Sequence, residues 1–135
     1  MRRDLRHVRG ARLPIYRFFS ILEYMGGREF LTQHELLVML AVLRLGREAY
    51  GVPIGAEIAE RTGREMLLGS VYATLDILER KGLVVSRLGE ATSKRGGRAK
   101  TYFRLTALGL RELRDAQRGL QALSEGLPQL EGVRP

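Results

Sequence analysis

The chain has 135 residues, and its 23 lysines and arginines exceed its 15 aspartates and glutamates, giving a formal net charge of +8 at pH 7. This length allows one domain with a modest core. The absence of cysteine excludes disulfides and thiolate sites, and the longest apolar run, residues 36–43, is too short to cross a bilayer. We therefore expect a soluble, cytoplasmic protein with no membrane association. The excess of basic residues favours nucleic acid as a partner, although charge alone also fits a merely basic protein.

The N-terminal residues 1–14 are rich in arginine and have no regular apolar spacing, which indicates a loosely held basic arm. From Pro14 the pattern changes to that of a helix, because apolar residues recur at helical spacing at Ile15, Phe18, Leu22 and Met25. This helix either needs its apolar face covered, is an appendage, or is upstream sequence included by the choice of start, since Met25 lies just before the more strongly patterned region. The sequence leaves these three interpretations open.

A capping box opens the next predicted helix, with Thr32 as the N-cap and Glu35 three residues later. The helix is predicted to run to about Leu45 and to stop at Gly46. Its nearly continuous apolar character indicates a buried element.

A short extended piece at residues 50–52 leads to a second helix, which Pro53 opens and Gly63 closes. Its inward-facing residues are predicted to be Ile54, Ile58 and Ala59. A tight connection joins it to the next helix.

The third helix is indicated by Val71, Leu75 and Leu78, which form a stripe at i, i+4 and i+7. Gly82 lies where a C-terminal cap belongs. The opposite side of this helix carries mainly small residues, which suits close approach to another molecule.

Two strands follow, at residues 83–88 and 101–105, and they can pair as an antiparallel hairpin. In the second strand Tyr102 and Arg104 alternate with residues of the other face. Residues 89–100 then form the loop at the tip, which carries a glycine pair and four cations: Lys94, Arg95, Arg98 and Lys100.

A final helix is predicted to begin near Thr106. Apolar residues repeat along it in alternating steps of three and four, the spacing of a helix-packing seam: Leu113, Ala116, Leu120, Leu123 and Leu127. A core this small cannot cover the whole seam, so we expect a homodimer whose interface contains Leu113, Ala116, Leu120 and Leu123.

The element order predicts a mainly α protein with a small β-hairpin, a winged helix-turn-helix with an N-terminal extension and a C-terminal dimerisation helix. Three parts are expected along the chain. They are a basic N-terminal arm and helix at residues 1–30, a DNA-binding domain at residues 31–105, and the dimerisation helix with its tail at residues 106–135.

Three segments also resemble the PadR family of bacterial transcriptional regulators: "AYGVPIGAEI", "LLGSVYATLDILERKGLV" and "GGRAKTYFRLTALG". The resemblance covers roughly residues 31–113. It implies a homodimeric regulator, usually a repressor, that binds an inverted repeat with two recognition helices and two wings. Some members of the family sense small hydrophobic molecules, so the resemblance also implies a potential effector.

Individual positions carry the resemblance. Tyr50 and Gly51 match the family's Tyr-Gly pair, and the positions that match the recognition helix and the wing are Gly69, Ser70, Tyr72, Arg98, Tyr102 and Thr106. Ala73 stands where the family commonly has proline. Asp76 and Ile77 lie where it often has a basic side chain.

The candidate DNA contacts are drawn from both elements and from Tyr50, which is the weaker candidate. On the third helix they are Gly69, Ser70, Tyr72, Ala73, Thr74, Asp76 and Arg80, and on the loop Lys94, Arg95, Arg98 and Lys100. Polar groups near a helix N-terminus can bond phosphate or base edges, and the loop cations can contact phosphate or the minor groove. Three alternatives stay open: Tyr72 only packs, the loop is simply solvated, and Asp76 pairs with Arg80 rather than with a cytosine amine.

An enzyme is the rival class, and the residues argue against it. His7 and His34 are the only histidines, and neither has a patterned acidic or nucleophilic neighbour, so we expect no catalytic residues, no metal and no cofactor. The segment "RGGRAKT" lacks the Gly-Lys-Thr or Gly-Lys-Ser of a phosphate loop. A nonspecific architectural DNA-binding protein, or a protein-interaction adaptor on the same fold, is the stronger alternative, because fold alone does not confer regulation.

Overall fold

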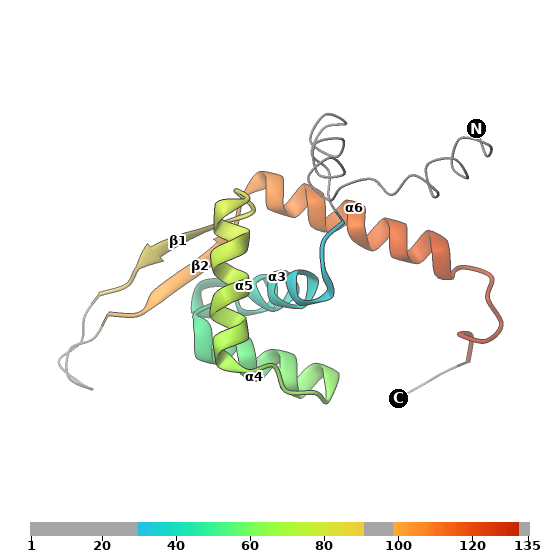
Figure 1. The fold of residues 1–135 in the computed structure, drawn as a ribbon, viewed down its shortest axis with the longest axis horizontal. Helices are drawn as coiled ribbons and strands as arrows, with labels where there is room; N and C mark the ends of the chain where they lie inside the picture. Colours follow the sequence, from blue (N-terminus) through green and yellow to red (C-terminus); the bar gives the residue numbers. More distant parts are fainter. Residues whose placement is uncertain (1–29, 91–98, 133–135) are drawn as a thin grey trace, which may run out of the picture. The chain divides into compact units, whose positions relative to one another are not determined.

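The structure is a computed structural model that describes residues 30–90 and 99–132. Residues Leu31–Pro135 form one compact unit. Its elements, in chain order, are α3 (Gln33–Leu45), the short 3-10 helix η1 (Gly46–Glu48), α4 (Gly51–Thr62), α5 (Leu68–Arg80), β1 (Val84–Leu88), β2 (Thr101–Leu105) and α6 (Ala107–Ser124) (Figure 1). The predicted mainly α class with a β-hairpin is confirmed. The predicted basic arm and the helix after Pro14 lie outside the described residues.

The capping box predicted for α3 is present. The Glu35 backbone N–H donates to the Thr32 hydroxyl at 3.1 Å, and the Glu35 carboxylate accepts from the Thr32 N–H at 2.8 Å. The helix ends at Gly46, whose φ of 59° lies in the region that favours glycine. Local signals therefore set both ends of α3.

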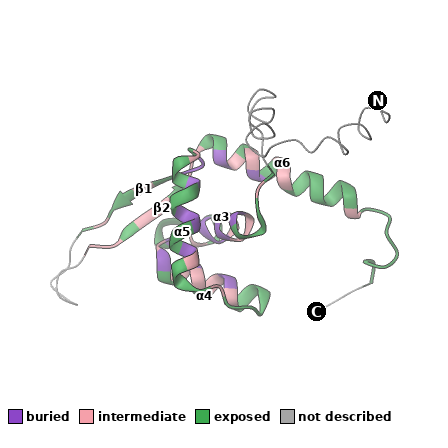
Figure 2. Cartoon of the chain, viewed as in Figure 1, coloured by how far each residue is buried: buried purple, intermediate pink, exposed green. Residues whose placement is uncertain are grey.

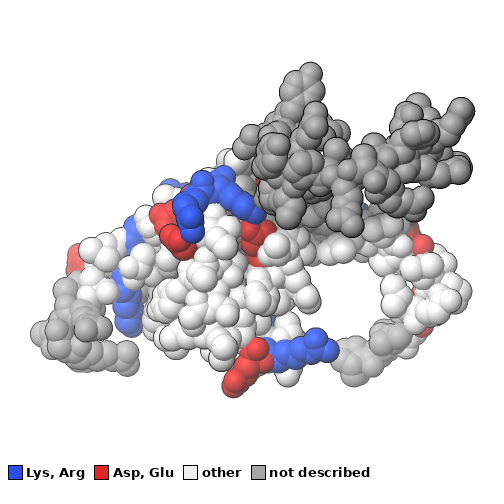
Figure 3. All heavy atoms as spheres, viewed as in Figure 1, with Lys and Arg blue, Asp and Glu red and all other residues white. Residues whose placement is uncertain are grey.

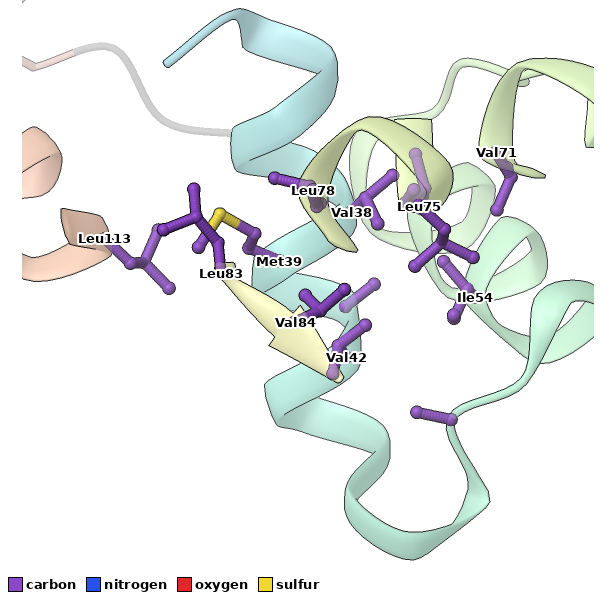
Figure 4. Close-up of a cluster of buried hydrophobic side chains, with 13 residues drawn as sticks. Val38, Met39, Val42, Ile54, Val71, Leu75, Leu78, Leu83, Val84 and Leu113 are labelled. Atoms are coloured by element: carbon purple, nitrogen blue, oxygen red, sulfur yellow. The ribbon is translucent and has the colours of Figure 1, made fainter. Parts of the chain in front are cut away.

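The core lies where α3, α4 and α5 meet, as the buried residues in Figure 2 show. Figure 4 shows the aliphatic side chains that fill it: Val38, Met39, Val42, Ile54, Val71, Leu75, Leu78, Leu83, Val84 and Leu113. Each such side chain contributes about 1.5–3 kcal/mol when it is fully buried. The predicted stripe of α5 and the inward residues Ile54 and Ile58 of α4 are all in this core.

The start of α4 differs from the prediction. Only Tyr50 is extended, and the helix already begins at Gly51, because the Tyr50 carbonyl accepts the N–H of Ile54 at 3.1 Å. Pro53 therefore lies within the first turn rather than opening the helix. This position tolerates proline because the N–H groups of a first turn have no partner within the helix.

The strands β1 and β2 pair antiparallel, from Val84 opposite Leu105 to Leu88 opposite Thr101. Tyr50 adds an isolated bridge to Tyr102 along the outer edge of β2, and the Phe103 N–H donates to the Ala49 carbonyl at 2.8 Å. We call the hairpin, with its connecting residues 89–100, the wing. Its two strands extend away from the three helices in Figure 1.

The helix α6 is fixed to the wing through its N-cap. The Thr106 hydroxyl accepts the N–H of Gly109 at 2.9 Å and donates to the Gly82 carbonyl at 2.7 Å. A Cβ at Gly109 would collide with the Leu83 carbonyl. Glycine is required here because the first turn of α6 lies directly against the start of β1.

The predicted seam of α6 needs two corrections. Leu127 lies beyond the helix, which ends at Ser124. Leu113 is only 3% exposed and packs in the core of its own chain. It has almost no surface left for a partner chain, because the first half of α6 lies against the body of the same molecule.

Among the described residues, no helix is both long enough and apolar enough to span a membrane.

Candidate nucleic-acid interface

The helix α5 has one buried face and one exposed face. Val71, Leu75 and Leu78 are buried against α3 and α4, whereas Gly69 and Ala73 lie on the exposed side. Figure 3 shows that the surface over the middle of this helix is uncharged, with charged side chains gathered toward its end and over the wing. An exposed helix of this width fits the major groove of B-DNA, which is about 12 Å wide.

Thr74 is the one candidate on α5 that the structure contradicts. Thr74 is only 6% exposed, because position 74 faces the interior of the protein, as Leu75 does. A side chain in that position cannot reach a base edge.

Asp76 and Arg80 form an ion pair across one turn of α5, at 2.7 Å between a carboxylate oxygen and a guanidinium nitrogen. Their side chains are 64% and 72% exposed. Of the two interpretations for Asp76, the structure shows the pairing with Arg80. An exposed pair of this kind contributes at most about 1 kcal/mol, so it can open when another group approaches.

Tyr72 packs directly against Gly51, at the start of α4. A Cβ at Gly51 would collide with the Tyr72 ring, so the ring occupies the space that any other residue would fill. Tyr72 nevertheless remains 47% exposed. It therefore packs on one side and still presents surface to solvent.

The first turn of α5 has no side-chain cap. Leu67 is the N-cap residue and offers no polar side chain, while Gly69 is exposed and Ser70 is half-buried. The N–H groups of this turn are thus available to water or to an anion such as a phosphate.

The candidates Lys94, Arg95 and Arg98 lie outside the described residues. Lys100 is described, and its Nζ lies 4.5 Å from the centre of the Tyr50 ring and 3.3 Å from the Tyr50 hydroxyl. The Tyr50 and Tyr102 rings meet edge to face at 5.4 Å. The Arg87 guanidinium lies 4.6 Å from the centre of the Tyr102 ring.

These four residues, Tyr50, Arg87, Lys100 and Tyr102, form a cation–aromatic cluster at the loop end of the paired strands of the wing. Cation–π contacts contribute roughly 0.5–1 kcal/mol each at exposed sites. The two contacts therefore hold Arg87 and Lys100 in defined orientations. Sequence reasoning missed Arg87 because only the strand register places it opposite Tyr102. The only sign of Arg87 in the sequence was a positively charged residue inside a predicted strand.

The residues expected at a dimer interface have different exposures. Leu120 and Leu123 are 52% and 80% exposed on the second half of α6. Ala116 is half-buried, and Leu113 belongs to the core described above. Within the described residues, the surface available to a partner on this helix is therefore centred on Leu120 and Leu123.

A cleft of about 780 Å³ lies between the wing, the end of α3 and the start of α6. Apolar side chains dominate its lining, including Leu43, Val85, Leu105 and Leu110. Clefts of this size commonly hold small molecules. In the described part of the chain, no group of three or more histidine, aspartate or glutamate side chains is placed to hold a metal ion.

Comparison with known proteins places this fold among transcriptional regulators. The model of the transcriptional regulator PadR-like family matches residues 39–115. A PadR-family transcriptional regulator from Eggerthella lenta is similar in structure, with a TM-score of 0.56 and 28% identity over 85% of this chain and 91% of that chain. No curated protein sequence matches significantly.

Two further solved structures share the fold. A PadR family transcription regulator from Clostridium difficile has a TM-score of 0.59 and 20% identity, over 75% of this chain and 100% of that chain. A transcriptional regulator from Clostridium thermocellum has a TM-score of 0.60 and 19% identity, over 73% of this chain and 89% of that chain.

Proposed function

Because the chain belongs to the PadR-like family of transcriptional regulators, which bind DNA, we propose that it is a sequence-specific repressor that binds an inverted repeat as a homodimer. The observation that carries this proposal is the exposed face of α5, which is uncharged in its middle and carries one closed ion pair, Asp76–Arg80. Its opposite face is locked into the core by Val71, Leu75 and Leu78. A rigidly held helix with a free outer face is what reading of the major groove requires.

The wing supplies the second contact of the proposed complex. Lys100 and Arg87 are held by two tyrosine rings at the loop end of its strands, and the sequence adds Lys94, Arg95 and Arg98 in the loop. Cations in this position can neutralise phosphates beside the groove that α5 enters. Such contacts position a protein on DNA, whereas contacts to base edges specify the sequence.

The homodimer is supported by the exposed leucines of α6. Leu120 and Leu123 lie on a helix whose first half is already packed, and their apolar surface is unfavourable in water without a partner. A twofold dimer presents two copies of α5, so its binding site is expected to be an inverted repeat with half-sites about one helical turn apart.

The proposal is tested by selecting binding sites from a pool of random-sequence DNA duplexes with the full chain. The expected result is enrichment of an inverted repeat, bound by two chains per duplex as measured by the mass of the complex. Recovery of no common sequence would contradict specific binding and would favour the architectural alternative. A single site bound by one chain would contradict the dimer.

Repression is tested with a reporter gene whose promoter contains the selected site. Expression is expected to fall when the protein is present and to recover when the site is scrambled. A rise in expression would instead identify an activator.

The cleft between the wing, α3 and α6 supports the further proposal of a small hydrophobic effector. It adjoins Arg87 and Tyr102 of the cation–aromatic cluster, so a bound molecule would contact this cluster on the wing. Addition of such an effector is expected to release the DNA. Substitution of Leu110 by glutamate, at the apolar lining, should remove the response while DNA binding persists.

A further inference from the structure

The exposed surface of α5 is unusually apolar for a helix that is proposed to contact a polyanion. Leu68, Tyr72 and Ile77 are 44%, 47% and 40% exposed, and Ala73 is exposed between them. The helix carries one arginine against two carboxylates, Asp76 and Glu79. That arginine is already paired with Asp76, and the middle of the surface is uncharged in Figure 3.

Apart from the N–H groups of its first turn and the closed Asp76–Arg80 pair, this face has few groups that can bind phosphates or the polar edges of guanine and cytosine. The edges of bases in the major groove present one apolar feature, the C5-methyl group of thymine. Aliphatic side chains such as those of Ala73 and Ile77 are complementary to it. The cations of the wing lie on a different element, so attraction to the backbone does not depend on α5.

We propose that α5 reads its operator chiefly through thymine methyl groups, which pack against Ala73 and Ile77. The inference rests on the proposed function, because it requires that α5 occupies the major groove. It adds the chemical class of the base pairs that are read: A·T pairs whose thymine methyl faces the middle of the helix. Ile77 is then a specificity-determining residue, and the Asp76–Arg80 pair borders the methyl contact.

The test uses the full chain and the operator obtained by selection, in which single thymines are replaced by uracil. This replacement removes only the methyl group and leaves all hydrogen-bonding groups in place. Affinity is expected to fall about fourfold for each contacted methyl, the value for one buried methylene-sized group. Thymines outside the two half-sites serve as the control and should be replaceable without loss.

The matched variant is Ile77→Ser. It should bind equally well to operators that carry thymine or uracil at the base pair that position 77 contacts. The chain is also measured on an operator in which every half-site thymine is uracil. If it still prefers this operator to scrambled DNA as strongly as before, the inference is overturned and the proposed function is left intact. Loss of all preference between operator and scrambled DNA, already with thymine present, would overturn both. If Ile77→Ser instead changes the number of chains in solution, the face is a protein contact and the inference is wrong.

Discussion

Gly51 is a residue whose identity is set by a neighbouring side chain. No positive φ requires glycine there, but a Cβ would collide with the Tyr72 ring. We predict that Gly51→Ala lowers the free energy of unfolding by about 1–3 kcal/mol, the usual cost of overpacking. The measurement is urea denaturation followed by circular dichroism.

Gly119→Ala is the matched control, because nothing lies within 4 Å of a Cβ at that position in α6. It should raise stability by up to about 1 kcal/mol, through the better helix propensity of alanine. Tyr72→Ala should relieve the cost of Gly51→Ala in the double variant. Equal stabilities of Gly51→Ala and the wild type would show that the Tyr72 ring moves aside freely.

At the same scale, the sequence located some candidates and misjudged others. Outward positions of α5 such as Ala73 followed from the spacing of its buried stripe. Thr74 was misjudged, since it lies three residues after the buried Val71 and is itself only 6% exposed. The cluster of Tyr50, Arg87 and Tyr102 depends on the register of distant segments, which no local pattern encodes.

Among the elements, α3 and α5 are joined by a buried ion pair. The Glu35 side chain is 4% exposed, and its second carboxylate oxygen lies 2.7 Å from Nζ of Lys81, the C-cap residue of α5. Its first oxygen already accepts the Thr32 N–H. The pair therefore ties the beginning of α3 to the end of the helix that is proposed to read DNA.

We predict that Lys81→Met costs at least about 2 kcal/mol of stability, because it leaves the buried Glu35 carboxylate without its cation. The 31% exposure of the Lys81 side chain admits some water, which keeps the cost below that of a fully enclosed pair. Arg80→Met, next in the chain, breaks only the exposed pair with Asp76 and should cost less than about 1 kcal/mol. Equal costs in thermal denaturation would contradict a structural role for the Glu35–Lys81 pair.

The elements themselves were largely predictable, because helix ends and hairpins are set by local chemistry. The capping box at Thr32 and the glycines after α3 and α4 marked their boundaries correctly. The start of α4 was misplaced because Tyr50, rather than Pro53, sets it by bridging to β2. Leu127 continued the spacing of α6 in the sequence, but the helix ends before Gly126, which has a φ of 77°.

For the whole molecule, we predict that Leu120→Asp with Leu123→Asp converts the proposed dimer to a monomer. Both side chains are more than half exposed, so the fold of the single chain should persist. Sedimentation equilibrium measures the mass, and circular dichroism checks the fold. Gln117→Asp with Gln121→Asp adds the same charge to α6 without removing a leucine and should remain dimeric. A double leucine variant that keeps the dimer mass would place the interface elsewhere.

Charge and specificity are divided between two elements of the proposed complex. The helix α5 carries no unpaired cation, whereas Lys100 and Arg87 lie at the loop end of the strands of the wing. Lys100→Ala should therefore weaken binding to all sequences alike. It should also reduce the magnitude of the slope of log affinity against log salt by about 0.9 for each phosphate that the variant no longer neutralises.

Ile77→Ser should reduce discrimination between sequences and leave that slope of log affinity against log salt nearly unchanged.

The most direct test of whether α5 reads sequence while the wing binds phosphate is fluorescence anisotropy. Binding of the wild-type chain is measured on operator and scrambled duplexes across a series of salt concentrations. We predict that the operator is bound at least roughly a thousandfold more tightly than the scrambled duplex. We also predict that Lys100→Ala lowers the salt slope on both duplexes. Equal affinity for the two duplexes, or a Lys100→Ala slope identical to that of the wild type, would contradict a sequence-reading α5 or a phosphate-binding wing, respectively.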